Sequence, residues 1–434
     1  MGVTTRTLTA DEAVQLLTTT DSLGLGLGPA NPHGLLAALS RRDDWENLTV
    51  ASALVLGLFD LFAHPGVHSR SGFFGPAERF HLATGADVQL VPAGFRQFAT
   101  ILEKSAPRVM MVQATTPDEQ GFVNLSLHHG ATYRELLRAG RDSQRVLMVE
   151  CSPHFPRTAS LAEYTNQIHV SDIDVLVMGD EHPFELPGEV ATPEDELIGA
   201  HALAFISPTA TIQTGIGAIP SVVAASLATR SGGSYGIHSE MFTEGLWQLH
   251  LAGKVSNAHK GLYDGVSVTT FALGPAAMYQ WLHNNPLVVF APVHIVNDPT
   301  VIGRNHALVS VNGAIAVDLF GQVVADSVAG RQISGVGGHE DFVAGAELEI
   351  DDASLICLRS TIEIDGVVHS RISAQLPSGS VVATPRHHTA VVITEYGSAD
   401  LRGLTVRERA RSLASIAHPQ FRDDLLIAAD QLGR

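Results

Sequence analysis

One stretch, Ala210-Thr-Ile-Gln-Thr-Gly-Ile-Gly-Ala-Ile-Pro220, decides the fold class. Its first five residues form an apolar, β-branched run typical of a buried strand, and the glycines permit a tight turn into a helix. Pro220 fits the first position of that helix, where its fixed φ is favourable and its missing N–H has no intrahelical partner to lose. A strand, a glycine turn and a helix in this order predict an α/β fold with a mainly parallel sheet.

Short apolar runs of the same kind alternate with helix-compatible segments along the whole chain. In the first half the predicted strands are 22–28, 48–56, 87–93, 108–114, 145–151 and 174–178. In the second half they are 210–215, 267–274, 287–296, 307–318, 354–359 and 389–395. An acidic, Pro-containing stretch at 180–193 interrupts the pattern and reads as a linker, so we predict two α/β domains, 1–195 and 196–434.

Two helix starts carry capping-box spacing. Thr9 precedes Glu12, and Thr405 precedes Glu408, by the three residues that let each pair satisfy the free N–H groups of a first turn. The second pair opens a predicted C-terminal helix that runs through Ala417.

Composition narrows the class of protein. The chain has 434 residues, 45% of them hydrophobic and 17% charged, which excludes disordered, collagen-like and coiled-coil classes. A net charge of -18 argues against broad nucleic-acid or anionic-membrane binding. The sequence lacks a long apolar run and an evident secretion signal, so a cytoplasmic location is expected. The two cysteines, Cys151 and Cys357, cannot form a disulfide framework and are expected to be buried.

The first candidate site is the glycine turn at 215–220. A helix start exposes N–H groups that bind anions, and glycine lets a ligand approach the backbone. Glu240 follows Pro220 by 20 residues, which imitates a dinucleotide fingerprint, but Pro220 replaces the third glycine and disfavours that interpretation. A tight turn without a ligand stays open as the structural alternative.

The second candidate site is Glu240, within Gly236-Ile-His-Ser-Glu-Met-Phe242. A carboxylate is already ionised, so as a nucleophile it needs no general base, only desolvation and a partner for the developing oxyanion. The structural alternative is that Glu240 caps a helix or pairs with His238 at the surface.

The third candidate site is Ser334-Gly-Val-Gly-Gly-His-Glu-Asp-Phe342. Three glycines in four positions predict a loop whose N–H groups face an oxyanion or a phosphate. A plain tight loop or β-bulge is equally compatible with this pattern.

Taken in order and at these spacings, the segments resemble the acetyl-CoA hydrolase/transferase family, nearest its 4-hydroxybutyrate and butyryl/acetyl CoA-transferase branch. The likeness spans nearly the whole chain. The motifs that carry it are the three candidate sites together with Asp118-Glu-Gln-Gly121, Phe155-Pro-Arg-Thr158, Val317-Asp-Leu-Phe-Gly-Gln-Val323, Thr394-Glu-Tyr-Gly397 and Leu401-Arg-Gly403.

The resemblance implies two similar open, mainly parallel-sheet CoA-transferase-like domains, with the active site at their junction and the catalytic glutamate in the C-terminal domain. That glutamate is Glu240, which would become an acyl-enzyme and then glutamyl-CoA, while Gly338 or its neighbour Gly337 would supply an oxyanion N–H. The positions matching the family's CoA contacts are Gly215, Ile216, Gly217, Ala218, Ile219, Asn312, Ser334 and Gly338.

The implied activity is transfer of coenzyme A between an acyl-CoA and a short-chain carboxylate, as in class I enzymes with an acetate or 4-hydroxybutyrate-like acceptor. The partners of such an enzyme would be small molecules, and no cofactor would be permanently bound. The resemblance is also compatible with a homo-oligomer. No H-E-x-x-H motif occurs, so no metal is expected. A hydrolase using the same site and a non-catalytic CoA-binding protein stay open as alternatives.

Three positions depart from the family pattern. His339 stands where the family usually has Gln, Gly313 where Ser is common, and Ser152-Pro153 where Asn-Pro is usual. Because His339 adjoins the glycine loop, the preferred acyl group stays open.

Overall fold

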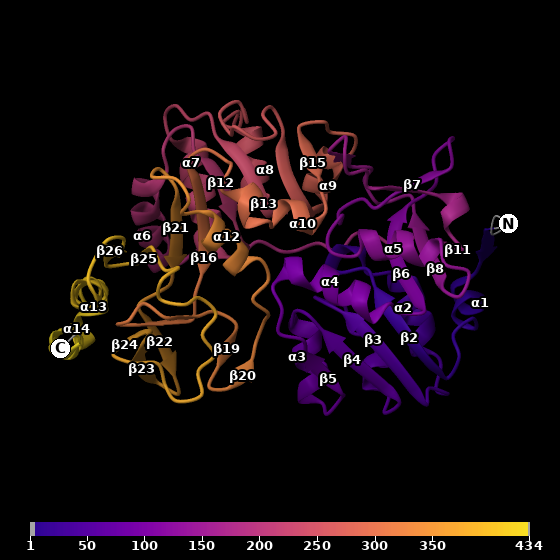
Figure 1. The fold of residues 1–434 in the computed structure, drawn as a ribbon, viewed down its shortest axis with the longest axis horizontal. Coiled ribbons are helices and arrows are strands. Elements are labelled where there is room, and N and C mark those ends of the chain that lie inside the picture. The colour runs from indigo at the N-terminus through magenta and orange to yellow at the C-terminus, as the bar shows by residue number, and fades with distance from the viewer. Residues whose placement is uncertain (1–4, 433–434) are drawn as a thin grey trace. The chain divides into compact units, whose positions relative to one another are not determined.

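The structure is a computed structural model that describes residues 5–432. These residues form two compact units (Figure 1). The first runs to Leu186 and includes Val268–Val296 and Ile333–Gly337; the second holds Pro187–Ser267, Asn297–Gln332 and the chain from Gly338 onward. The units are discontinuous in sequence, whereas the predicted domains are two continuous blocks that meet at residue 195.

An eight-stranded sheet organises the first unit, and its neighbouring strands are all parallel. The spatial order is β1 (Arg6–Leu8), β11 (Val175–Met178), β8 (Val146–Ser152), β6 (Val109–Thr115), β2 (Thr20–Leu25), β3 (Asn47–Ser52), β4 (Val67–Ser71) and β5 (Val88–Leu90). The helices of this unit are α1 (Ala10–Val14), α2 (His33–Ser40), α3 (Pro76–Ala83), α4 (Phe95–Ser105), α5 (Tyr133–Gly140), α9 (Ala276–Leu282) and α10 (Val293–Val296). The other strands are β7 (Phe122–Asn124), β9 (Ala159–Ser160), β10 (Gln167–His169), β15 (Val288–Phe290) and β14 (Ser267–Ala272), of which Ser267 falls in the second unit.

Alternate residues of each strand point to opposite faces of this sheet. Apolar side chains occur on both faces, and helices cover both. On β6, Val109 and Met111 enter the core that α1 and α2 cover. Met110 and Val112 enter the core that α5 covers. Strands buried on both faces are the reason that the sequence reads as unbroken apolar runs.

The second unit contains the sheet order β26, β25, β21, β16, β12, β13, parallel except between β25 and β26. These strands are β12 (Thr211–Thr214), β13 (Gly236–Phe242), β16 (Leu308–Gly313), β21 (Ala353–Cys357), β25 (Val391–Thr394) and β26 (Gly397–Asp400). The helices are α6 (Pro193–Ala202), α7 (Ala218–Thr229), α8 (Glu244–Leu251), α11 (Pro299–Ile302), α12 (His339–Gly345), α13 (Val406–Ser415) and α14 (Pro419–Gln431). Small sheets join β17 (Ala316–Asp318) to β18 (Val323–Val324) and β24 (Ile372–Ser373), β19 (Ser327–Val328) to β20 (Arg331–Gln332), and β22 (Thr361–Ile364) to β23 (Val367–Ser370).

The predicted α/β class with mainly parallel sheets is confirmed. A strand or part of one occurs in every predicted run, whereas four strands of the large sheets described above were not predicted: β1, β4, β13 and β26. The run 287–296 is not one strand: Pro292 follows β15, and α10 begins directly after it. The run 307–318 divides into β16 and β17.

Both capping boxes are confirmed, at Thr9 and at Thr405, although α13 ends at Ser415 rather than at Ala417. The prediction for Pro220 is wrong, because α7 begins at Ala218 and Pro220 is its third residue. Proline is tolerated there because the first four N–H groups of a helix have no intrahelical partner.

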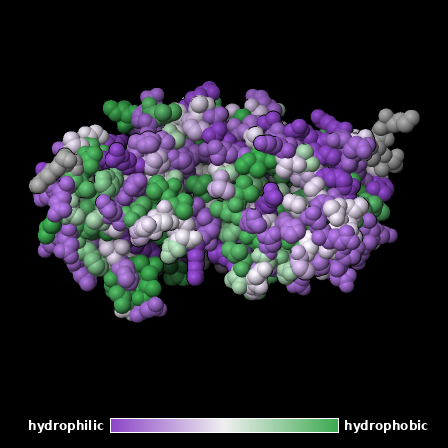
Figure 2. Space-filling model, turned by 60° about the horizontal axis from the view of Figure 1, so that its bottom comes forward, coloured by the Kyte–Doolittle hydropathy of each residue, from purple (hydrophilic) through white to green (hydrophobic). Residues whose placement is uncertain are grey.

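Figure 2 shows hydrophilic and apolar residues interspersed over the face that it displays. The β22–β23 hairpin leaves Ile364 48% and Val367 55% exposed, so these apolar residues lie outside the cores. Cys151 and Cys357 are free and buried, as predicted. Among residues 5–432, none of the helices is long and apolar enough to cross a membrane.

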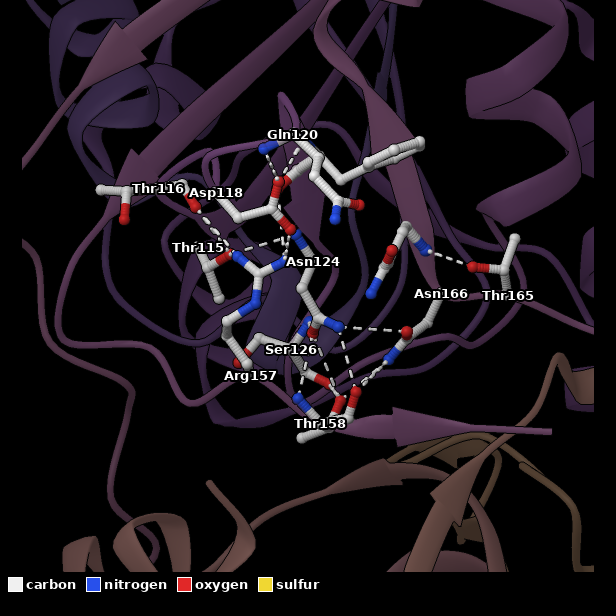
Figure 3. Close-up of polar contacts among 12 residues, drawn as sticks. Thr115, Thr116, Asp118, Gln120, Asn124, Ser126, Arg157, Thr158, Thr165 and Asn166 are labelled. Carbon is white, nitrogen blue, oxygen red and sulfur yellow. Dashed lines mark hydrogen bonds and ion pairs between the residues drawn. The ribbon is translucent and has the colours of Figure 1, made fainter. Parts of the chain in front are cut away.

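Two motifs of the first half, Asp118-Glu-Gln-Gly and Phe155-Pro-Arg-Thr, meet in a polar network (Figure 3). The Arg157 guanidinium donates to the Asp118 carboxylate at 2.8 Å, and to Thr115 Oγ1, Thr116 O and Phe122 O at 3.3 Å each. The pKa of Asp118 is held below its usual value, chiefly by the N–H of Phe122 and with a contribution from Arg157.

Asn124 continues the network. Its Oδ1 accepts from the Ser126 and Thr158 N–H groups, and its Nδ2 donates to Thr158 O and to Asn166 Oδ1 (Figure 3). The two motifs therefore tie the end of β6, strand β7 and the segment around Arg157 into one rigid corner.

This corner predicts a stability effect. Replacing Arg157 by Met leaves its four oxygen partners without their shared donor, and we expect the free energy of unfolding to fall by about 1–3 kcal/mol. Arg141→Met is the matched control, because Arg141 is 65% exposed and only approaches Asp172 at 3.7 Å. Denaturant unfolding of both variants checks the prediction, and equal midpoints would contradict it.

Candidate active site

Glu240 lies near the carboxyl end of strand β13. The strand ends at Phe242, and Thr243 then caps α8 by accepting from the Leu246 N–H. Glu240 is therefore not a helix cap, and His238, two residues earlier on the same strand, is fully buried and not at the surface. The position suits a reacting group, since open α/β sheets bind ligands beyond the carboxyl ends of their strands.

The buried side chain of Asn297 holds the Glu240 carboxylate. Its Nδ2 donates to Glu240 Oε2 at 2.5 Å and lies 3.4 Å from Asp341 Oδ2. One amide thus joins a carboxylate on β13 to a second carboxylate on α12. Neither the Asn297 contact nor a role for Asp341 was predicted from the sequence.

Gly338 packs directly against this carboxylate. A Cβ placed on Gly338 would lie 1.9 Å from Glu240 Oε2 and 2.2 Å from Asn297 Nδ2, which is far inside van der Waals contact. Gly338 is also the N-cap of α12, with an ordinary φ of -94°. The lack of a side chain, not a special backbone conformation, is therefore what this position requires.

The charge of Glu240 is perturbed by this setting. Burial raises its pKa to about 7, and the neighbouring negative charge of Asp341 raises it too, whereas the hydrogen bond from Asn297 opposes the rise. With a pKa of about 7, part of the Glu240 population is ionised near pH 7, and a partly desolvated carboxylate is a stronger nucleophile than a fully solvated one.

A cavity of about 240 Å³ lies elsewhere in the second unit, at the carboxyl ends of β12, β16 and β21. Chain order reverses between β12 and β16, and such a switch point leaves room for a ligand. The lining residues are Glu189, Asp195, Ile216, Gly217, Ala218, Ile219, Pro220, Val311, Asn312, Gly313, Ala314, Cys357, Leu358, Arg359 and Arg371.

The glycine turn shapes this cavity. Gly217 has a φ of 120°, which strongly favours glycine, and it places the first residues of α7 at the cavity wall. The Ala218 N–H donates to the Glu189 carboxylate at 3.1 Å, so an anionic group already binds at this helix start. Arg359 also lines the cavity and forms a bidentate ion pair with Asp195.

The predicted CoA-contacting residues fall in different places. Five of them line the cavity: Ile216, Gly217, Ala218, Ile219 and Asn312. The described residues that line it do not include the other three, Gly215, Ser334 and Gly338, nor do they include the predicted nucleophile, Glu240.

The glycine loop divides between the two units. Ser334 and Gly337 belong to the first unit, where Gly337 O accepts from the Phe95 N–H at 2.8 Å. Gly337 has a φ of 56°, so its backbone conformation favours glycine. Gly338 belongs to the second unit, with Glu240.

The raised pKa of Glu240 predicts a pH-dependent stability effect. Because the folded-state value of about 7 exceeds the unfolded value of about 4.5, Glu240 lowers the free energy of unfolding progressively as pH rises through that window. We expect Glu240→Gln to raise Tm at pH 8 and to change it little at pH 5. Thermal melts against pH check this, with exposed Glu363→Gln as control; parallel Tm profiles for the wild type and Glu240→Gln would contradict it.

Comparison with known proteins places the chain in a family. The model of the acetyl-CoA hydrolase/transferase C-terminal domain matches residues 274–429. The chain is 34% identical to 4-hydroxybutyrate coenzyme A transferase of Clostridium kluyveri, covering 96% of both proteins, and 32% identical to butyryl-CoA:acetate CoA-transferase of Anaerostipes caccae, covering 98% of this chain and 95% of that one. RipA from Yersinia pestis superimposes with a TM-score of 0.88 at 31% identity, covering 98% of this chain and 97% of RipA. By these matches the chain belongs to the acetyl-CoA hydrolase/transferase family.

Proposed function

We propose that this protein transfers coenzyme A between an acyl-CoA and a short-chain carboxylate, with Glu240 as the nucleophile. The observation that carries the proposal is the Glu240 carboxylate itself, half-buried, held by Asn297 and pressed against the backbone of Gly338. Its relatives in Clostridium kluyveri and Anaerostipes caccae are CoA-transferases, which supports the reaction class.

The first half-reaction forms an anhydride. A Glu240 oxygen attacks the thioester carbonyl carbon, the carbon–sulfur bond breaks, and CoA leaves as a thiolate. The developing negative charge on the carbonyl oxygen needs N–H donors, and the backbone at Gly338 and Gly337 is the proposed source. The CoA thiolate then attacks Glu240 Cδ, which releases the first carboxylate and leaves a glutamyl-CoA thioester.

The second half-reaction reverses these steps with a new acid. The acceptor carboxylate attacks Glu240 Cδ and expels CoA thiolate, which forms a second anhydride. The thiolate then attacks the acceptor's acyl carbon, so that a new acyl-CoA leaves and the Glu240 carboxylate is restored. The thioester bond energy is conserved, and coenzyme A takes part only as a substrate.

The cavity at the switch point is the proposed binding place for part of CoA. The start of α7 supplies N–H groups that suit an anionic or carbonyl oxygen, and Asn312 adds a polar side chain to the same wall. Gly215, the first residue of the glycine turn, and Ser334 remain proposed CoA contacts on the strength of the family pattern.

The nucleophile gives the central prediction. Glu240→Gln is isosteric but not anionic, so we expect it to abolish turnover while CoA binding persists; Glu240→Asp, one methylene shorter, is expected to be severely impaired. Wild type incubated with acyl-CoA alone should accumulate a CoA adduct that borohydride reduces or hydroxylamine traps at Glu240. Peptide mass spectrometry locates the adduct, and near-normal turnover by Glu240→Gln would overturn the proposal.

Steady-state kinetics separate transfer from hydrolysis. Varying acyl-CoA against acetate, propionate or butyrate should give the parallel double-reciprocal lines of a ping-pong mechanism. Release of free thiol that no added carboxylate changes would instead identify a hydrolase. CoA binding with neither product would identify a non-catalytic protein.

The contact at Gly338 gives a further prediction. Because the Gly338 φ is ordinary, alanine adds steric conflict with Glu240 and Asn297 without backbone strain, and we expect kcat to fall by about 100-fold. Gly179→Ala is the control, since its nearest neighbour would be in ordinary contact at 3.4 Å. Equal kcat values for the two variants would contradict the proposed placement.

A further inference from the structure

The first turn of α12 is tied to the rest of the second unit by a line of polar side chains. His339 Nε2 lies 2.9 Å from Thr384 Oγ1, which donates to Glu340 Oε2 at 3.0 Å. The other oxygen of the Glu340 carboxylate contacts His388 Nδ1. We call His339, Thr384, Glu340 and His388 the α12 relay.

Hydrogen-bond direction in the relay is determined by the Thr384 hydroxyl. A hydroxyl has one hydrogen, which Thr384 gives to Glu340, so it must accept from His339. His339 is therefore in the tautomer that carries hydrogen on Nε2. Burial lowers the pKa of His339 to about 4, which keeps the ring neutral near pH 7.

Thr384 is a firm anchor for the relay. It is fully buried, its O accepts from the Val323 N–H at 3.0 Å, and its N–H donates to Val323 O at 3.3 Å. Val323 belongs to β18 and packs in the same apolar core as Val343 of α12. The relay thus connects the small β17–β18–β24 sheet to the start of α12 through both side chains and core.

The opposite side of the same helical turn touches the nucleophile. Gly338, directly before His339, lies against the Glu240 carboxylate, and Asp341 approaches Asn297, which holds Glu240. A small shift of this turn would therefore move the groups around Glu240, and reactions at a fixed nucleophile are sensitive to displacements of about 1 Å.

We propose that Thr384 and His339 are positioning residues that hold the Gly338–Asp341 turn in register with Glu240. They act through the backbone and do not touch the reacting atoms. The proposal rests on the proposed function for its kinetic consequences, but the hydrogen bonds that it invokes exist independently of any reaction.

Paired variants test the relay. Thr384→Ser and His339→Gln keep a hydroxyl and an N–H donor, and should hold kcat within about threefold of the wild type. Thr384→Val and His339→Leu remove them, and should lower kcat by roughly 10- to 100-fold with the KM for acyl-CoA almost unchanged. His339→Leu serves as the informative variant if Thr384→Val does not fold, because His339 is not fully buried.

Thr389→Val is the matched control. Thr389 is 2% exposed, lies near Thr384 in sequence and donates to Gly321 O at 2.7 Å, outside the relay. Its loss also removes a buried hydroxyl hydrogen bond, and it should leave kcat near the wild-type value. If Thr389→Val lowers kcat as much as Thr384→Val, the positioning role is overturned.

A readout that needs no turnover separates this proposal from the proposed function. Hydrogen–deuterium exchange of peptides spanning residues 338–345 should quicken in Thr384→Val and His339→Leu, and not in Thr389→Val. Unchanged exchange there, or equal damage by Thr384→Ser and Thr384→Val, overturns the relay. If the wild type shows no CoA transfer and exchange still quickens in Thr384→Val and His339→Leu, the proposed function is overturned and the relay is supported.

Discussion

Two carboxylates, Glu240 and Asp341, share the amide of Asn297, and this shared contact constrains the candidate active site. Glu240 and Asp341 repel each other, and removing Glu240 from water disfavours its ionised form. Asn297 offsets part of that cost by donating to both. The three side chains come from β13, from the segment after α10, and from α12, so the arrangement holds only if all three elements keep their places.

The same constraint explains the packing around the site. No side chain fits at Gly338, because the space that a Cβ needs is filled by Glu240 and Asn297. The neighbouring turn must then be held by groups on its other side, where Thr384 and Val323 connect it to a small sheet. Rigid support behind a reacting group limits the motion of that group.

The fold was largely predictable because buried parallel strands leave a simple mark in the sequence. Val109 to Val112 are apolar in succession, since each residue faces one of two cores. Strand β13 escaped prediction because His238, Ser239 and Glu240 interrupt its apolar pattern. Asn297 carries no local signal at all: its partner on β13 is distant in sequence, and only the tertiary fold brings them together. The glycine motifs did indicate Gly217 and Gly338. The positive φ of Gly217 requires glycine, and the close approach of Glu240 leaves no room for a side chain at Gly338.

Comparable helix starts occur in the two units. In the first unit α2 follows β2 next to the switch point with β6, and the buried Glu150 carboxylate accepts the Gly34 and Leu35 N–H groups there. In the second unit α7 follows β12 next to the switch point with β16, and its start borders a cavity. A carboxylate of the chain itself therefore accepts helix N–H groups in both units, Glu150 in the first and Glu189 in the second, and in the second unit a cavity lies beside it.

The strand order of the first unit also governs how the chain folds during synthesis. Strand β1 pairs with β11, where Arg6 lies opposite Val175, so β1 finds its neighbour only after the other seven strands of the eight-stranded sheet have been synthesised. Strands β2 to β5 assemble earlier, because each pairs with the next in sequence. Pairing over so long a separation is slow, and until it occurs the edge of β11 is exposed to other chains. Until β1 pairs with β11, the nascent first unit is thus open to misassociation at one defined edge.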